Sequence, residues 1–125
     1  MIASIPAPGR TVPSLPNARA LLVNAQGIAG AAHDNPKAAD VLTFQKGISD
    51  ARTAAEMLLV AEPRSDFQDL AGASKLATAG ADALTLAMSQ LFTFLPGNIV
   101  DKNIKQHSGT AFDKFESAFE IIDND

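Results

Sequence analysis

The spacing of hydrophobic residues along the chain predicts a protein built of α-helices. Apolar positions recur at intervals of three and four residues, as in helices that turn one side to a core, and no segment alternates with the period of two typical of strands. We therefore expect an all-α fold, with one helical-bundle domain over residues 17–125. Its four principal helices are predicted at about 17–32, 36–62, 65–95 and 110–122, with a short helical segment near 99–106.

The predicted third helix organises this arrangement because it carries two apolar faces. Between Leu76 and Leu95 the only charged residue is Asp82. A helix this apolar must pack against other helices on several sides, so we expect it at the centre of the bundle. Asp82 then lies either on a solvent edge or at the polar end of a ligand site. The run from Ala83 to Leu95 is about 13 residues, shorter than the roughly 20 that cross a bilayer, and extending it back to Leu76 would bury Asp82. No transmembrane span is therefore expected.

The first 16 residues predict an extended arm because four prolines fix the backbone and remove hydrogen-bond donors. Such an arm is either a loose terminus or a segment that docks on a neighbouring protein or carries an export signal. No basic stretch followed by an apolar run is present, so a conventional signal peptide is not expected. Three possibilities therefore stay open: the protein remains in the cytoplasm, it leaves the cell by another route, or its signal peptide has already been removed from this sequence.

Composition narrows what the core can be. The apolar residues are mainly Ala, Leu, Ile and Val, with seven Phe and no Trp or Tyr. Alanine lets helices approach closely, and Phe can fill the wider gaps between them. Two interpretations follow: the Phe and Leu side chains form a filled core, or the Ala-rich walls leave a cavity for an acyl chain. The aromatic residues concerned are Phe92, Phe94, Phe112, Phe115 and Phe119.

Charge and motifs argue against several classes of function. The net charge is −4 and basic residues do not gather, so no nucleic-acid partner is expected. The absence of cysteine excludes disulfides and thiolate chemistry. Phosphate-binding, metal-binding and nucleophile motifs are also missing, and His33 and His107 fall in loop-like stretches where we expect surface residues. We predict neither an enzyme nor a bound metal or cofactor.

Three stretches resemble the fungal hydrophobic surface-binding protein A and cell-wall galactomannoprotein family. They are AEMLLVAEPRSDF (55–67), ADALTLAMSQLFTFLP (81–96) and FDKFESAFEI (112–121), within a resemblance that covers residues 40–122. The resemblance implies a secreted helical bundle that binds apolar surfaces or fatty-acid-like ligands. Its matching positions, together with Met88 from the third helix, are our candidate ligand-binding residues: Phe67, Leu84, Met88, Leu91, Phe112, Phe115 and Phe119.

Two functional hypotheses follow from the sequence. The first is a non-enzymatic helical bundle that binds an apolar small molecule or a hydrophobic surface, and is secreted. The alternative is a helical structural subunit or exported effector of a secretion or assembly apparatus. In that case the protein acts through protein–protein contacts or self-association, with the N-terminal arm as the contact.

Overall fold

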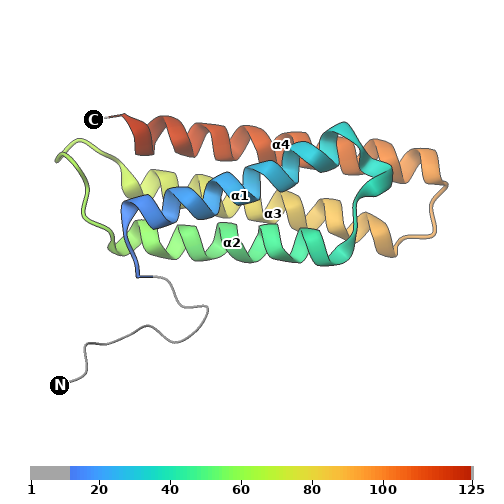
Figure 1. Ribbon diagram of the computed structural model, residues 1–125. Helices are drawn as coiled ribbons and strands as arrows, with labels where there is room; N and C mark the ends of the chain where they lie inside the picture. The colour runs from blue at the N-terminus through green and yellow to red at the C-terminus, as the bar shows by residue number, and fades with distance from the viewer. Residues whose placement is uncertain (1–11, 125) are drawn as a thin grey trace, which may run out of the picture.

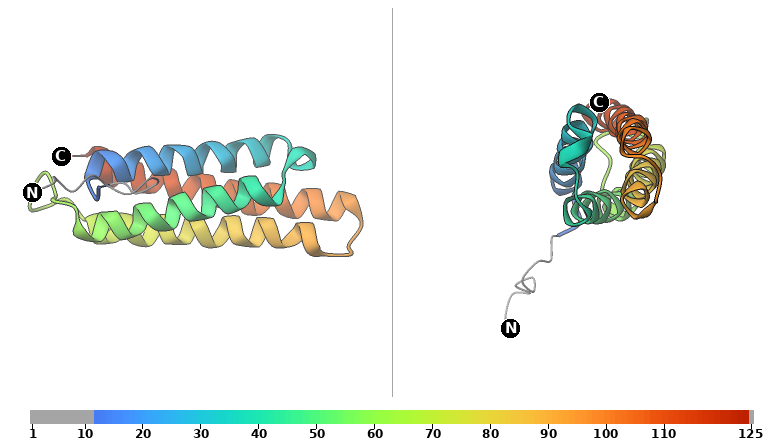
Figure 2. Two further views of the ribbon diagram at one scale, coloured as in Figure 1. Left: turned by 60° about the horizontal axis from the view of Figure 1, so that its bottom comes forward. Right: turned by 90° about the vertical axis from the view of Figure 1, so that its right-hand side faces the viewer.

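The computed structural model describes residues 12–124 and shows four antiparallel α-helices (Figure 1). Each helix packs against the next along the chain, and the last returns to the first, so that the four surround one core (Figure 2). The predicted all-α bundle is confirmed. The helices are α1 (Leu15–Asp34), α2 (Val41–Val60), α3 (Leu70–Ser89) and α4 (Gly97–Asp123), with short 3-10 turns η1 (Pro36–Ala38) and η2 (Gln90–Phe92).

Helix α1 begins earlier than predicted, because a serine caps it. The Ser14 hydroxyl accepts a hydrogen bond from the backbone N–H of Asn17 at 3.2 Å. Pro16 is tolerated in the first turn, because backbone N–H groups there have no hydrogen-bond partner within the helix and the N–H that proline lacks is not needed. The last two residues of the predicted arm are therefore helical. Residues 1–11, which make up most of that arm, lie outside the described part of the chain.

Helices α2 and α3 begin later than predicted because aspartates cap both of them. The Asp40 carboxylate accepts from the N–H of Thr43 at 2.9 Å, and the Asp69 carboxylate accepts from the N–H of Gly72 at 2.8 Å. An aspartate at the N-cap satisfies an otherwise unpaired donor of the first turn. Residues 36–40 and 65–69, which we predicted to be helical, are therefore a 3-10 turn and irregular connections.

Helix α4 runs unbroken across the predicted stop at Ser108 and Gly109, so the segments predicted at 99–106 and 110–122 are one helix. Tertiary packing explains the difference. Ser108 is fully buried, and a Cβ atom added to Gly109 would lie 3.1 Å from the His33 ring of α1. These small residues let α1 and α4 approach closely, and the packing outweighs their low helix propensity.

The core is filled mainly by small side chains around a few large ones. More than half of the buried hydrophobic residues are alanine, and Phe44 and Phe115 are the largest fully buried side chains. Phe115 of α4 lies directly over Gly80 of α3, where an added Cβ would come within 2.3 Å of the ring. The glycine leaves the space that the phenylalanine occupies, so this contact sets how α3 and α4 pack.

Asp82, the charged residue of the apolar third helix, lies on the outside of the bundle. Its side chain is 63% exposed, and its carboxylate forms an ion pair with Arg52 of α2 at 3.0 Å. The solvent-edge alternative is therefore the one observed, and Asp82 is not the polar end of an interior ligand site. Within residues 12–124, no helix combines the length and the apolar character needed to cross a membrane.

Candidate apolar binding surface

The aromatic residues that we predicted on α4 divide among three environments. Phe115 is fully buried in the core. Phe119 is nearly buried and lies beneath Arg19 of α1, whose guanidinium carbon is 5.1 Å from the ring centre, a cation–π contact. Phe112 is 38% exposed, and its ring lies 3.4 Å from the position of a Cβ atom on Gly30. The three rings therefore meet three different neighbours rather than one shared chamber.

The other predicted ligand-binding residues are also dispersed. Leu84 of α3 is fully buried, whereas Met88 and Leu91 are half-buried against the edge of the core. Phe67 lies in the connection between α2 and α3 and is 96% exposed, at the end of the bundle opposite to Leu91 (Figure 1). The structure thus brings Leu84 and Met88 together on one helix and leaves Phe67 far from them.

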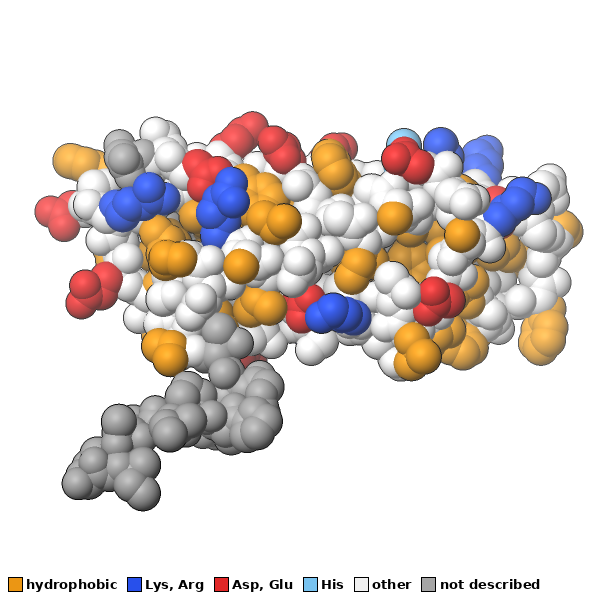
Figure 3. Space-filling view, in the orientation of Figure 1, with side chains coloured by type: hydrophobic (Ala, Val, Ile, Leu, Met, Phe, Trp, Pro, Cys, Tyr) orange, Lys and Arg blue, Asp and Glu red, His pale blue; other side chains and the backbone are white. Residues whose placement is uncertain are grey.

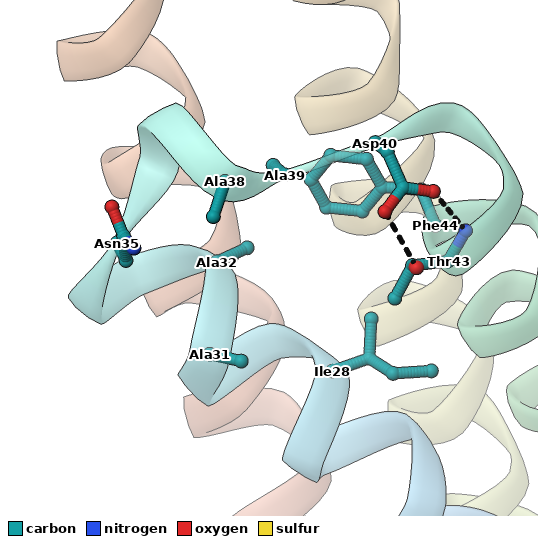
Figure 4. A pocket seen from close by; sticks show the side chains of 9 residues that line it. All are labelled: Ile28, Ala31, Ala32, Asn35, Ala38, Ala39, Asp40, Thr43 and Phe44. Atoms are coloured by element: carbon teal, nitrogen blue, oxygen red, sulfur yellow. Dashed lines mark hydrogen bonds between the residues drawn. The ribbon is translucent and has the colours of Figure 1, made fainter.

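A small hollow lies where α1 passes into α2 (Figure 4). Its volume is about 100 Å³, and Ile28, Phe44 and several alanines form its apolar wall. Asp40 stands at its rim with both carboxylate oxygens bonded to Thr43, and these bonds hold the pKa of Asp40 below its usual range. Ligand sites for drug-sized molecules occupy roughly 300–1,000 Å³. This hollow is too small for an acyl chain, and its carboxylate serves as a helix cap.

A larger open hollow of about 650 Å³ lies at the other end, between the start of α1 and the end of α2. Arg19 and Arg64 line it, together with apolar residues that include Leu15 and Val60. Arginines beside an apolar wall are the chemistry expected for a carboxylate ligand with an apolar tail. Whether the arginines can bind such a ligand depends on which residues they already contact.

Both arginines bind the C-terminal end of α4. Arg19 forms two hydrogen bonds with the Asp123 carboxylate, at 2.7 and 2.9 Å, and these bonds hold the pKa of Asp123 below its usual range. Arg64 donates to the backbone carbonyl of Ile122, which also accepts from Gln68 at 2.9 Å. The last carbonyls of a helix lack partners within it, so these side chains cap α4. We therefore assign this hollow a structural role.

Metal ligands do not cluster in the part of the chain that the structure describes, where no group of three His, Asp or Glu side chains is placed to hold an ion. His33 and His107 are both half-buried, and His33 lies 3.2 Å from Asp34, its neighbour in sequence.

Exposed hydrophobic side chains occur at both ends of the bundle: Leu59, Val60 and Phe67 at the end of α2 and in the connection that follows it, and a second group at the connection between α3 and α4. We call this second group the apolar tip. Phe94 is fully exposed, Phe92 is 65% exposed, and no charged residue occurs from Ala83 to Val100. Figure 3 shows hydrophobic side chains at the corresponding end of the molecule. The apolar tip comprises Phe92, Phe94, Leu95 and Ile99.

The connection that carries the apolar tip is held in place by hydrogen bonds. Gln90 accepts from the Thr93 hydroxyl at 2.8 Å through its carbonyl, and from the side-chain amide of Asn103 at 2.9 Å through its own side chain. Pro96 accepts from the N–H groups of Ile99 and Val100 and so begins α4. The tip is therefore a defined loop whose aromatic side chains point away from the core.

The predicted third helix continued to Leu95 and so included Phe92, Phe94 and Leu95, and this end was wrong. The helix ends at Ser89 and passes through a short 3-10 turn. A residue before proline avoids the helical conformation, so Leu95 before Pro96 could have shortened the predicted helix by one residue, but this signal does not reach back to Ser89. Because the helix ends early, Phe92 and Phe94 do not face the neighbouring helices against which the periodic spacing predicted that they would pack.

Comparison with models of known protein families, with curated proteins and with solved structures finds no match to this chain.

Proposed function

We propose that this protein is a non-enzymatic helical bundle that binds an apolar surface with its apolar tip. The observation that carries the proposal is the exposure of Phe94, beside Phe92, at one end of the bundle. Covering an exposed Phe side chain contributes about 2 kcal/mol. Single exposed apolar residues are common on monomers, whereas a group of them marks a contact site.

Binding at the surface is favoured over binding in the interior because the core is filled. Phe115 occupies the space above Gly80, where a cavity lined by the aromatic residues of α4 would have to lie. The apolar hollow beside Phe44 is only about 100 Å³. Of the two targets that the sequence predicted, a hydrophobic surface therefore has more support than an enclosed fatty-acid-like ligand.

A pair of matched variants tests this function. Phe94 and Phe67 are both exposed, both lie in connections between helices, and stand at opposite ends of the bundle. We expect Phe94→Ser to weaken adsorption to alkyl-coated silica beads by about tenfold or more, because the lost burial is worth about 2 kcal/mol. Phe67→Ser should adsorb like the wild type. Binding isotherms measured by depletion from solution give the comparison.

Neither substitution removes a buried contact, so both variants should keep the helical circular dichroism and melting temperature of the wild type. Equal losses of adsorption in the two variants would show that any exposed Phe suffices, and the tip would lose its assigned role. No adsorption of the wild type would contradict the proposed function as a whole.

Secretion belongs to the same proposal, because the family resemblance of residues 40–122 implies a secreted protein. We expect most of the full-length protein in the culture medium of the cells that naturally produce it. Immunoblots of medium and cell fractions measure this, with a cytoplasmic enzyme as the control for lysis. Recovery in the cell fraction alone would favour the cytoplasmic alternative.

A further inference from the structure

Charge is distributed unevenly between the two ends of the bundle. At the end that carries the apolar tip, three carboxylates are balanced by three lysines: Asp34, Asp40 and Asp101 against Lys37, Lys102 and Lys105. The net charge of −4 therefore comes from elsewhere in the chain. It lies at the opposite end, where six carboxylates face two arginines, Arg19 and Arg64. The carboxylates are Glu62, Asp66 and Asp69 before α3, and Glu116, Glu120 and Asp123 in the last turns of α4.

The three lysines at the tip end are exposed, and two of the three carboxylates beside them, Asp40 and Asp101, are engaged by neighbouring residues. The third carboxylate, Asp34, is 83% exposed and lies 3.2 Å from the His33 ring. Asp101 is only 25% exposed and lies 3.5 Å from Lys37, whose side chain is 83% exposed. Asp40 is engaged in capping α2. Among residues 12–124, Lys102 has no carboxylate within the 4.0 Å of an ion pair. Lys105 donates a hydrogen bond to the backbone carbonyl of His33 at 3.3 Å and, within the same residues, forms no ion pair.

The distance between the apolar and the basic groups matches the structure of a membrane surface. Lys102 follows Ile99 by three residues on α4, so both lie on one side of the helix. At 1.5 Å per residue, Lys102 and Lys105 stand about 5 and 9 Å behind Ile99 along the axis. Side chains that bind at a bilayer interface enter it by about 5–10 Å, with cations at the level of the headgroups.

We infer that the apolar surface bound by the tip is the interface of a lipid bilayer that contains anionic headgroups. This inference rests on the proposed function and names its target. Phe92 and Phe94 enter the boundary of the acyl chains, and Lys37, Lys102 and Lys105 meet the headgroup phosphates. The acidic end points away: a 20-residue helix spans about 30 Å, well beyond the Debye length of about 8 Å at physiological salt.

A second copy of the chain fits the tip less well than a bilayer does. The four side chains of the apolar tip are fewer than the roughly 20 residues that each partner contributes to a stable interface of about 800 Å². Two tips meeting end to end would also bring Lys102 near its counterpart, with like charges opposed. A bilayer needs neither a large matching area nor a complementary shape.

Flotation with vesicles tests the inference on the full-length protein. We expect binding to vesicles of phosphatidylcholine with about 30% phosphatidylserine to be at least tenfold stronger than to phosphatidylcholine alone, and to weaken in 0.5 M salt, since each lysine near an anionic surface adds attraction. The double variant Lys102→Glu/Lys105→Glu should lose at least tenfold on the anionic vesicles. The matched variant Lys75→Glu/Lys114→Glu makes the same charge change at exposed positions away from the tip and should bind like the wild type.

Alkyl-coated beads separate failure of this inference from failure of the proposed function. Lys102→Glu/Lys105→Glu should still adsorb to uncharged beads, whereas Phe94→Ser should fail on both beads and vesicles. Adsorption of the wild type to beads without binding to vesicles would overturn the lipid inference and leave the proposed function in place. Equal binding to neutral and anionic vesicles, or a dimer in light scattering that Phe94→Ser abolishes, would also overturn it.

Discussion

Replacing Phe115 by alanine should lower the free energy of unfolding by about 4 kcal/mol, because deleting a fully buried Phe removes its contacts and leaves a cavity. Chemical denaturation followed by circular dichroism at 222 nm measures the change, since the chain has no Trp or Tyr to report by fluorescence. Phe112→Ala is the matched control on the same helix. Phe112 is 38% exposed, so its truncation should cost about 1 kcal/mol.

The Phe115→Ala variant also separates a filled core from a ligand chamber. The space left above Gly80 is apolar and enclosed, so a small probe such as benzene should bind there and raise the melting temperature of the variant. The wild type should show no such rise with benzene or with a fatty acid. A rise in the wild type with fatty acid would restore the interior ligand site and count against the filled core.

The part of the fold that was predictable from sequence is the part set by local periodicity. Spacings of three and four residues located four helices. The same spacing placed Phe112, Phe115 and Phe119 on one side of the last helix, where Phe115 and Phe119 are buried and Phe112 is 38% exposed. Helix ends depend instead on single capping contacts, such as Asp69 to Gly72, which compete with continuation of the pattern. Boundaries were accordingly the least accurate part of the prediction.

Long-range packing explains the remaining differences. The Ser108-Gly109 pair signals a break when read locally, yet α1 packs against it through His33 and the helix continues. The candidate site was harder to predict than the helices, because periodicity identifies apolar residues without showing which of them are exposed to solvent. Phe92 and Phe94 belong to the same apolar run as Leu84, and only the position where α3 ends separates exposed residues from buried ones.

Gly80→Ala should destabilise the protein by about 2 kcal/mol, although alanine is the better helix former. The added Cβ would lie 2.3 Å from the buried ring of Phe115, and relieving such a clash costs about 3 kcal/mol, against roughly 1 kcal/mol gained in helix propensity. Gly27 is the matched control, since a Cβ there meets nothing within 4 Å. Gly27→Ala should stabilise the protein by about 1 kcal/mol, so denaturation curves for the two variants should shift in opposite directions.

A double-mutant cycle then assigns the cost to the contact between the two helices. In the Phe115→Leu background the flat ring is gone, so adding the Gly80 methyl group should cost less than about 1 kcal/mol, leaving a coupling free energy above 1 kcal/mol. Additive effects would mean that the methyl group clashes with something other than Phe115. The same contact fills the space between α3 and α4, so additivity would also be evidence against a filled core. A core that is not filled would in turn favour an interior ligand site over binding at the apolar tip.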